Sequence, residues 1–217
     1  MKELKAKKQR VKKIILRLKK LLPGAKIVLK YSNNWELLVA VMLSAQCTDK
    51  MVNKVTEKLF KKYKTLNDYI KANPKGFEKD IKSCGFYKNK TKNILTTAKI
   101  IKEKFNARVP NTMGDLLTLR GVARKTANVV LGNAFHIYDG IAVDTHVRRL
   151  SKLYGLTNHD DPDKIEQDLM KIIPKKDWFK FTYLMIDYGR KYCPAKKHDH
   201  KNCPLVKILR NSNKGNA

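Results

Sequence analysis

The chain has 217 residues, a length that suits one large domain or two small ones. Hydrophobic residues make up 42% of the chain, enough for a sizeable core, so we do not expect global disorder. A formal net charge of +29 favours a polyanionic partner, of which nucleic acid is the first candidate and an anionic membrane surface the second. A general excess of lysine that is unrelated to binding is the alternative explanation for this charge.

Membrane and secreted classes are not favoured. The longest uninterrupted apolar run, Leu37–Leu43, is far shorter than the about 20 residues that cross a bilayer. The lysine-rich N-terminal region has no apolar stretch ending in small residues, so we expect a non-secreted protein of the cytoplasm or nucleoid and no membrane partner. Four cysteines in such a chain do not predict a disulfide scaffold.

The spacing of apolar residues is helical almost throughout. A lysine-rich helix is predicted over 2–22, ended by Pro23-Gly24, and a buried helix over 35–45, opened by a capping box from Asn33 to Glu36. Residues 27–31 have the composition of a strand, but no partner run follows them, so we predict an all-α chain. The other predicted helices cover 49–62, 66–72, 76–83, 88–105, 113–118, 123–134, 145–153, 162–172 and 176–190.

Residues 119–130, LRGVARKTANVV, carry the most information about function. They place a glycine-containing turn between a short helix and a new one. Such a turn presents backbone N–H groups and a helix N-terminus, which together bind a phosphate without reading bases. We interpret the segment as a helix–hairpin–helix element, and from these residues alone an ordinary turn that packs two helices is equally open.

A second motif, residues 141–149 (IAVDTHVRR), follows the hairpin. With it the chain resembles the endonuclease III family of DNA base-excision glycosylases, whose pattern is close to L-P-G-V-G-R-K-T-A-N-V-V followed by V-D-T-H-V. Residues 37–49 (LLVAVMLSAQCTD) and 81–89 (IKSCGFYKN) are similar to two further family motifs. The resemblance therefore covers nearly the whole chain, from about residue 20 to about residue 205.

The resemblance implies a fold and a partner. The fold would be two α-helical lobes with DNA in the cleft between them. The first lobe would be a six-helix unit over 25–138, with the hairpin near 113–134. The second would combine residues 1–24 with 139–217. The family acts as monomers on double-stranded DNA that contains damaged bases or abasic sites, and we expect the same partner here.

The resemblance also assigns chemistry to two residues. Lys125 would be the nucleophile and Asp144 the carboxylate that assists it. An amine that attacks C1′ of the nucleotide leaves a Schiff base, which permits β-elimination of the 3′ phosphate. Lys125 therefore favours a bifunctional enzyme, a glycosylase for oxidised pyrimidines that is also an AP lyase. Two alternatives stay open: a glycosylase of the same fold for another damaged or mismatched base, and a non-catalytic helix–hairpin–helix DNA-binding protein.

Further residues are assigned to DNA by the same resemblance. Gln46 and Phe86 would fill the gap that a flipped nucleotide leaves, with a core aromatic as the alternative for Phe86. Ala123 stands where the family has a glycine, and would be strained by about 1 kcal/mol if its φ were positive. A helix-capping role for Asp144 is compatible with catalysis. The remaining candidate DNA contacts are Arg120 (a proline in the family), Gly121, Arg124, Thr126 and His146, the last of which also suits a structural role.

Many family members hold a [4Fe–4S] cluster on the pattern C-x6-C-x2-C-x5-C near the C-terminus. In the matching segment of this chain, 193–209, the four positions fall at Cys193, His200, Cys203 and Leu209. With only two thiolates, we predict that the cluster is absent and that no cofactor is required. Zinc held by Cys193, His198, His200 and Cys203 is the alternative. Lysines 196, 197, 201 and 207 would still give this segment a positive charge.

Overall fold

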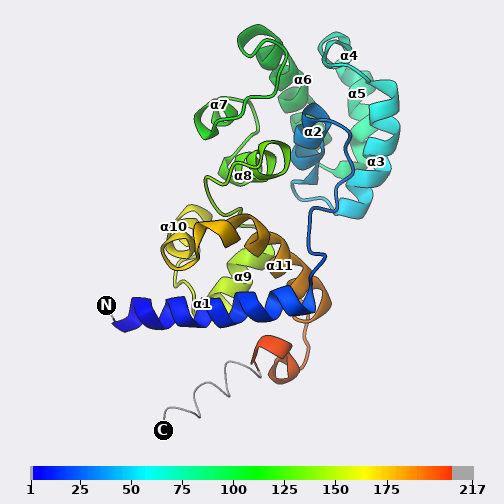
Figure 1. The fold of residues 1–217 in the computed structure, drawn as a ribbon. Helices are drawn as coiled ribbons and strands as arrows, with labels where there is room; N and C mark the ends of the chain where they lie inside the picture. The colour runs from blue at the N-terminus through cyan, green and yellow to red at the C-terminus, as the bar shows by residue number, and fades with distance from the viewer. Residues whose placement is uncertain (1, 207–217) are drawn as a thin grey trace. The chain divides into compact units, whose positions relative to one another are not determined.

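The computed structural model describes residues 2–206 and consists of helices and connecting loops (Figure 1). No strand occurs within these residues, which confirms the predicted all-α class. Residues 27–31 belong to a connecting segment instead of a strand. Among the described residues, no helix has both the length and the apolar character needed to cross a membrane.

The chain divides into two compact units, with boundaries between Ile27 and Val28 and between Asp139 and Gly140. The boundaries predicted from the sequence lie after residues 24 and 138. The first unit is the continuous segment Val28–Asp139. The second unit joins the N-terminal residues up to Ile27 with the residues that follow Asp139.

The continuous unit is built around one apolar helix, α2. Every residue of α2 from Leu37 to Leu43 is buried, and the helix packs against α3, α6 and α8 (Figure 1). A run of seven buried residues has no polar face, so α2 is surrounded on several sides. The helices of this unit are α2 (Asn34–Ser44), α3 (Asp49–Lys62), α4 (Leu66–Lys71), α5 (Pro74–Ile81), α6 (Tyr87–Lys104), α7 (Met113–Leu117) and α8 (Arg124–Val130).

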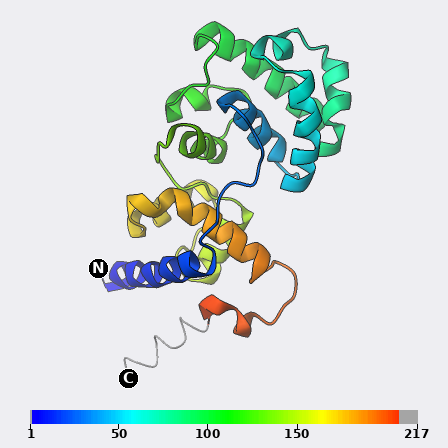
Figure 2. The same cartoon turned by 45° about the vertical axis from the view of Figure 1, so that its right-hand side comes forward.

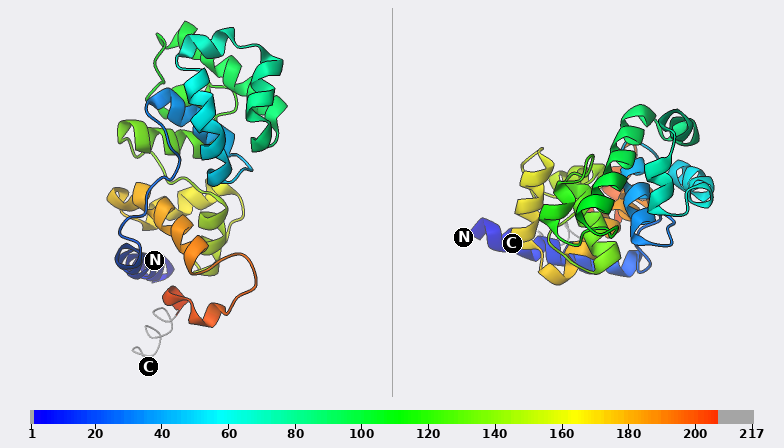
Figure 3. Two further views of the ribbon diagram at one scale, coloured as in Figure 1. Left: turned by 90° about the vertical axis from the view of Figure 1, so that its right-hand side faces the viewer. Right: turned by 90° about the horizontal axis from the view of Figure 1, so that it is seen from above.

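The discontinuous unit contains α1 (Lys2–Leu21), α9 (Thr145–Leu153), α10 (Pro162–Ile172) and α11 (Trp178–Lys191). Helix α1 packs against α10 and α11, and α9 packs against α11 as well (Figures 2 and 3). The α1 face that meets this core carries Val11, Ile14, Ile15 and Leu18, which recur at helical spacing and are all buried. The helix thus completes a core in which all the other buried members except Ala25 lie more than a hundred residues later in the chain.

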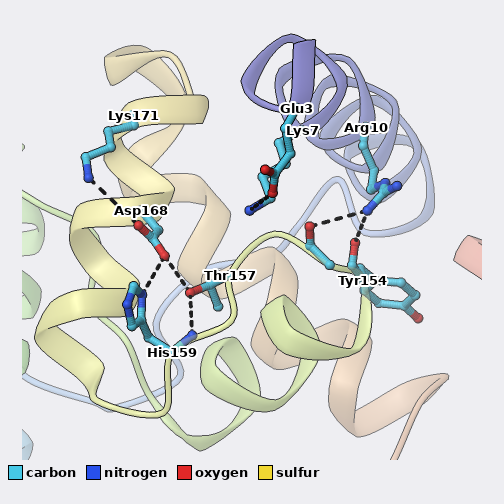
Figure 4. Close-up of polar contacts among 9 residues, drawn as sticks. Glu3, Lys7, Arg10, Tyr154, Thr157, His159, Asp168 and Lys171 are labelled. Carbon is cyan, nitrogen blue, oxygen red and sulfur yellow. Dashed lines mark hydrogen bonds and ion pairs between the residues drawn. The ribbon is translucent and has the colours of Figure 1, made fainter. Parts of the chain in front are cut away.

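Polar contacts fix the connections of this unit (Figure 4). Arg10 Nη1 donates to the carbonyl oxygens of Tyr154 and Gly155, at 3.3 Å each, and so ties α1 to the end of α9. Asp168 of α10 accepts from the Thr157 hydroxyl at 2.7 Å and lies 2.8 Å from Nδ1 of His159. The α9–α10 connection is therefore bound to the helix that follows it.

Short polar side chains start most of the helices. Each accepts a hydrogen bond from a backbone N–H in the first turn, where the helix itself offers no acceptor. The capping residues of α2, α3, α4, α5, α7, α9 and α10 are Asn33, Thr48, Thr65, Asn73, Thr112, Asp144 and Asp161.

Three helices differ from the predicted ranges by two residues or more at one end at least. Helix α5 begins at Pro74, two residues before the predicted start. The helix predicted over 123–134 ends its α-helical part at Val130 and continues as a π turn, Leu131–Phe135. Helix α11 begins at Trp178 after a short 3₁₀ turn, Lys175–Asp177.

Candidate nucleic-acid interface

The hairpin before α8 depends on a glycine. Gly121 has φ +79°, a left-handed conformation that favours glycine. A Cβ at this position would also lie 2.6 Å from the Asn93 side chain on α6. The turn is closed by a hydrogen bond from Val122 N to the Leu119 carbonyl at 3.2 Å. Backbone conformation and the close approach of α6 thus both require glycine at position 121.

The hairpin is also fastened to α6 through Arg120. Its carbonyl oxygen accepts from the Thr97 hydroxyl at 3.0 Å, and its Nε donates to Asn93 Oδ1 at 3.3 Å. Arg120 is nevertheless exposed. Ala123, the residue before α8, has φ −96° and ψ 170°, which is ordinary extended backbone. The strain that the sequence analysis attaches to a positive φ at this position therefore does not arise.

Lys125 lies in the first turn of α8 and is half-buried, as are its neighbours Arg124 and Thr126. The turn before α8 contains Gly121 and Ala123, and Lys125 is the second residue of the helix that follows it. The arrangement places three polar side chains at the N-terminal end of a helix, where the aligned peptide dipoles favour a negatively charged ligand.

Gln46 and Phe86 are exposed and adopt the same unusual backbone conformation. Gln46 has φ 53° and Phe86 has φ 46°, both left-handed, and the Phe86 side chain is 64% exposed. Left-handed conformations in residues other than glycine cost about 1–3 kcal/mol and persist where the surroundings impose them. The two residues and Gly121 line one shallow pocket, together with Met42, Asn89, Lys90 and Asn93.

A buried lysine joins the two loops that carry Gln46 and Phe86. Lys90 Nζ donates to the carbonyl oxygens of Leu43 (2.8 Å), Ala45 (2.7 Å) and Cys84 (2.8 Å). Lys90 is only 6% exposed, and burial lowers its pKa. Three carbonyls use all the donors of its ammonium group. Lys90 therefore connects the end of α2 to the loop before α6. No pattern in the sequence indicates this role.

Asp144 and His146 lie in the discontinuous unit, at the start of α9. Asp144 is half-buried, and its Oδ1 accepts from Val147 N at 2.8 Å, so it is the N-cap of α9. This bond also fixes the direction of the carboxylate. The His146 ring lies against Gly189 of α11, so closely that a Cβ on the glycine would collide with it. His146 thus has a packing role, whereas its assignment to DNA stays a prediction.

Four potential metal ligands converge after α11. Nδ1 of His200 lies 3.5 Å from Sγ of Cys193, and Nε2 of His198 lies 3.3 Å from Sγ of Cys203. The four ligand atoms all lie within 4.8 Å of one another. Both cysteines are buried, and burial raises the pKa of the Cys203 thiol to about 11. The group is a candidate metal centre. Leu209 and Lys207, also part of the predicted loop, lie outside the described residues.

Comparison with known proteins gives consistent matches. The sequence profile of the HhH-GPD superfamily of base excision DNA repair proteins matches residues 39–175. Endonuclease III of Synechocystis sp. is 50% identical over 203 residues, which are 94% of this chain and 93% of that protein. Endonuclease III of Bacillus subtilis is 45% identical over 193 residues, 88% of each chain.

A solved structure described as a trapped covalent intermediate of endonuclease III and DNA, an estranged-adenine complex, superposes with a TM-score of 0.89. Its sequence is 44% identical, and the match covers 96% of this chain and 98% of that one. The sequence matches and the structural match therefore extend over both compact units.

The prediction that the [4Fe–4S] cluster is absent and that no cofactor is required is wrong. Endonuclease III proteins typically carry a [4Fe–4S] cluster, and in this chain Cys193, His198, His200 and Cys203 form a group that can hold a metal. These are the four residues named above for the zinc alternative, and His198 is not one of the four family cluster positions. The donors present are two thiols and two imidazoles, not the four thiolates that hold such a cluster in the family.

Proposed function

Because this chain belongs to the endonuclease III family, within the HhH-GPD superfamily of base excision DNA repair proteins, we propose that it excises damaged bases by an amine-based reaction at Lys125. The protein is a bifunctional base-excision enzyme, a DNA glycosylase and AP lyase, and its partner is DNA. Its place of action is the nucleoid in the cytoplasm. The observation that carries the proposal is the position of Lys125 directly behind the glycine hairpin, half-buried in the first turn of α8.

Lys125 supplies the nucleophile. Its neutral amine attacks C1′ of the damaged nucleotide, the bond from C1′ to the base breaks, and the base leaves with a proton. The aminal that results opens when the bond between C1′ and O4′ breaks and O4′ takes a proton, and the iminium so formed acidifies the proton on C2′. Loss of that proton breaks the bond between C3′ and the 3′ phosphate, and water then releases the enzyme.

Asp144 provides the negative charge for this reaction. A carboxylate stabilises the positive centre that develops at C1′ as the base departs. Its capping bond to Val147 N holds the carboxylate in one direction, so little reorganisation is needed during the reaction. Capping and catalysis are therefore two uses of a single side chain.

The pocket around Gly121 is the surface that holds the distorted DNA. A damaged base must leave the stack before it can react, and an apolar side chain fills the space it vacates. Phe86, which is exposed and lines the pocket, is the apolar wedge, and Gln46 pairs with the base left behind. The hairpin holds phosphates through Arg120, Gly121, Ala123, Arg124 and Thr126. His146, at the start of α9, is a separate DNA contact in this proposal.

Borohydride trapping tests the proposal. The protein is incubated with a duplex that carries thymine glycol, an oxidised pyrimidine, or with one that carries an abasic site, and is then reduced. We expect a covalent complex on both duplexes. Lys125→Gln abolishes it, whereas Lys99→Gln, at an exposed lysine on α6, leaves it unchanged.

Each other result has a definite meaning. Trapping on the abasic duplex alone would retain the lyase and reject oxidised pyrimidines as the substrate, in favour of another damaged or mismatched base. Trapping that persists in folded Lys125→Gln protein would reject Lys125 as the nucleophile. Lack of trapping in folded protein that still binds the duplex would refute the amine mechanism altogether.

A further inference from the structure

We propose that Cys193, His198, His200 and Cys203 bind one tetrahedral Zn²⁺ ion that stabilises the segment following α11. The ligand atoms would be both Sγ atoms, Nε2 of His198 and Nδ1 of His200. The inference is independent of the reaction at Lys125, since it rests on the geometry of residues 193–203 alone.

The separations between the ligand atoms are those of ligands that share one ion. Zinc lies about 2.3 Å from sulfur and about 2.0–2.1 Å from nitrogen, so neighbouring ligands of a tetrahedral site are roughly 3.3–3.8 Å apart. The Cys193–His200 and Cys203–His198 pairs are separated by 3.5 Å and 3.3 Å. The other pairs, all within 4.8 Å, need only a small contraction to close the site.

The protonation of His198 also suits a metal ligand. Its Nδ1 lies 2.9 Å from the carbonyl oxygen of Lys196. A carbonyl can only accept, so Nδ1 is the donor and carries the proton. Nε2 then carries the lone pair, and this is the atom that faces Cys203 Sγ. A hydrogen bond from the other ring nitrogen is the usual way in which proteins orient a histidine that binds a metal.

The charges balance at the centre of the group. Two thiolates and two neutral imidazoles neutralise a Zn²⁺ ion, and such a mixed sulfur and nitrogen set in a tetrahedron is typical of zinc. Arg149 of α9 adds positive charge near the sulfur atoms, because its Nη1 lies 3.9 Å from Cys193 Sγ. Its Nη2 donates to the Cys193 carbonyl at 2.6 Å, which fixes the first ligand to α9.

The segment that carries the ligands is fastened at both ends to Tyr188 of α11. Cys193 N donates to the Tyr188 carbonyl at 3.1 Å, and Leu205 N donates to the Tyr188 hydroxyl at 3.2 Å. Cys193 and Leu205 are fully buried. Between these anchors the regular structure is one short 3₁₀ turn, His200–Asn202, and the start of a helical turn at residue 204, so an ion would supply internal contacts that regular structure does not provide.

Metal analysis of the full-length, tag-free protein tests the proposal. The protein is incubated with zinc, passed over a desalting column and assayed together for zinc, iron and acid-labile sulfide. We expect one zinc per chain, with a melting temperature that rises on zinc addition and falls on chelation. With cobalt in place of zinc, we expect the visible bands of a tetrahedral, thiolate-bound ion.

Two matched pairs of variants locate the ion. His198→Asn and Cys203→Ser remove ligands, whereas His136→Asn and Cys47→Ser change the same residue types in the other unit. The first pair should weaken zinc affinity by about 100-fold or more, since loss of even an outer-shell partner costs 10–100-fold. The second pair should bind zinc as the unchanged protein does. His198 is half-buried, so His198→Asn keeps the test valid if Cys203→Ser fails to fold.

Three results would overturn the inference. The first is zinc that washes off the folded protein, and the second is zinc affinity that survives both ligand substitutions. The third is iron with stoichiometric sulfide in place of zinc, which would identify a cluster instead of a single ion.

Discussion

At the scale of single residues, Gly121 and Lys90 both shape the proposed DNA surface, but only Gly121 can be recognised from the sequence. Gly121 stands out because it interrupts a helical pattern inside a motif. Lys90 does not, because about one residue in five is lysine, and its role depends on carbonyls of Leu43 and Ala45 that lie more than forty residues away in the chain. A long-range contact of this kind leaves no local pattern.

Replacement of Gly121 by alanine should destabilise the hairpin. The left-handed φ and the contact with Asn93 together predict a loss of about 1–3 kcal/mol in the free energy of unfolding. Affinity for duplex DNA should fall with it. Urea denaturation and a binding titration measure the two effects.

Gly114 provides the matched control, because it lies in the helix α7 with open space around its Cα. Gly114→Ala should leave stability equal or raise it by about 0.5–1 kcal/mol. If Gly121→Ala behaved like Gly114→Ala, the conformational argument for the hairpin would be wrong.

At the scale of helices, the predicted elements agree with the structure where the chain carries local signals. Capping residues and apolar spacing place α2, α3, α9 and α10 within about a residue of their observed bounds. Helix α5 is the exception: its start is signalled by Asn73-Pro74, the same cap-plus-proline pattern that correctly predicts α10. The π turn after α8 has no such signal in the chain.

Substitutions at Asp144 should separate its two roles at the start of α9. Asn caps a helix about as well as Asp does, so Asp144→Asn should keep the stability of the protein while borohydride trapping slows by about 100-fold or more. Asp144→Ala should lose the trapping and also about 1 kcal/mol of stability. Denaturation curves and single-turnover trapping measure the two quantities.

Asp161→Asn, at the cap of α10, is the control for capping without catalysis and should leave both quantities nearly unchanged. Full trapping activity in Asp144→Asn would show that the carboxylate charge is not needed.

At the scale of the whole molecule, the all-α class follows from composition and spacing, whereas the convergence of distant groups does not. The metal-ligand group illustrates why. Its fourth ligand, His198, lies five residues before Cys203, and only the turn between them brings its Nε2 to the sulfur. Family spacing points to position 209 as the fourth ligand of a cluster, and from the sequence His198 enters only as part of the alternative zinc set. The pairing of α1 with α10 and α11 is similarly a property of the folded core.

The protein should lose stability in alkaline solution. Burial raises the pKa of Cys84 from 9.0 to about 12 and also raises the pKa of Tyr63 and Tyr69. In alkaline solution these groups stay protonated in the folded protein but ionise in the unfolded chain. Their contribution to the free energy of unfolding is therefore complete below the pKa of the unfolded chain, and it is lost as the pH rises toward the pKa of the folded protein. Burial lowers the pKa of Lys90, so this group has the opposite influence on the pH dependence of stability.

Urea midpoints at about pH 8 and about pH 10 measure this loss. Cys84→Ala should reduce the difference between the two midpoints, whereas Cys47→Ser should change it less because Cys47 is only half-buried. A midpoint that rises with pH would contradict the assignment of buried, protonated groups.

The discontinuous unit has a consequence for synthesis on the ribosome. Helix α1 emerges first, yet its partners α10 and α11 are translated about 150 residues later. Translation proceeds at roughly 5–20 residues per second, so the apolar face of α1 has no partner helices for on the order of ten seconds. The continuous unit is complete before those helices are translated. The ten lysine and arginine side chains of α1 keep that waiting segment in solution, so part of the positive charge of the chain serves the nascent protein before any DNA is bound.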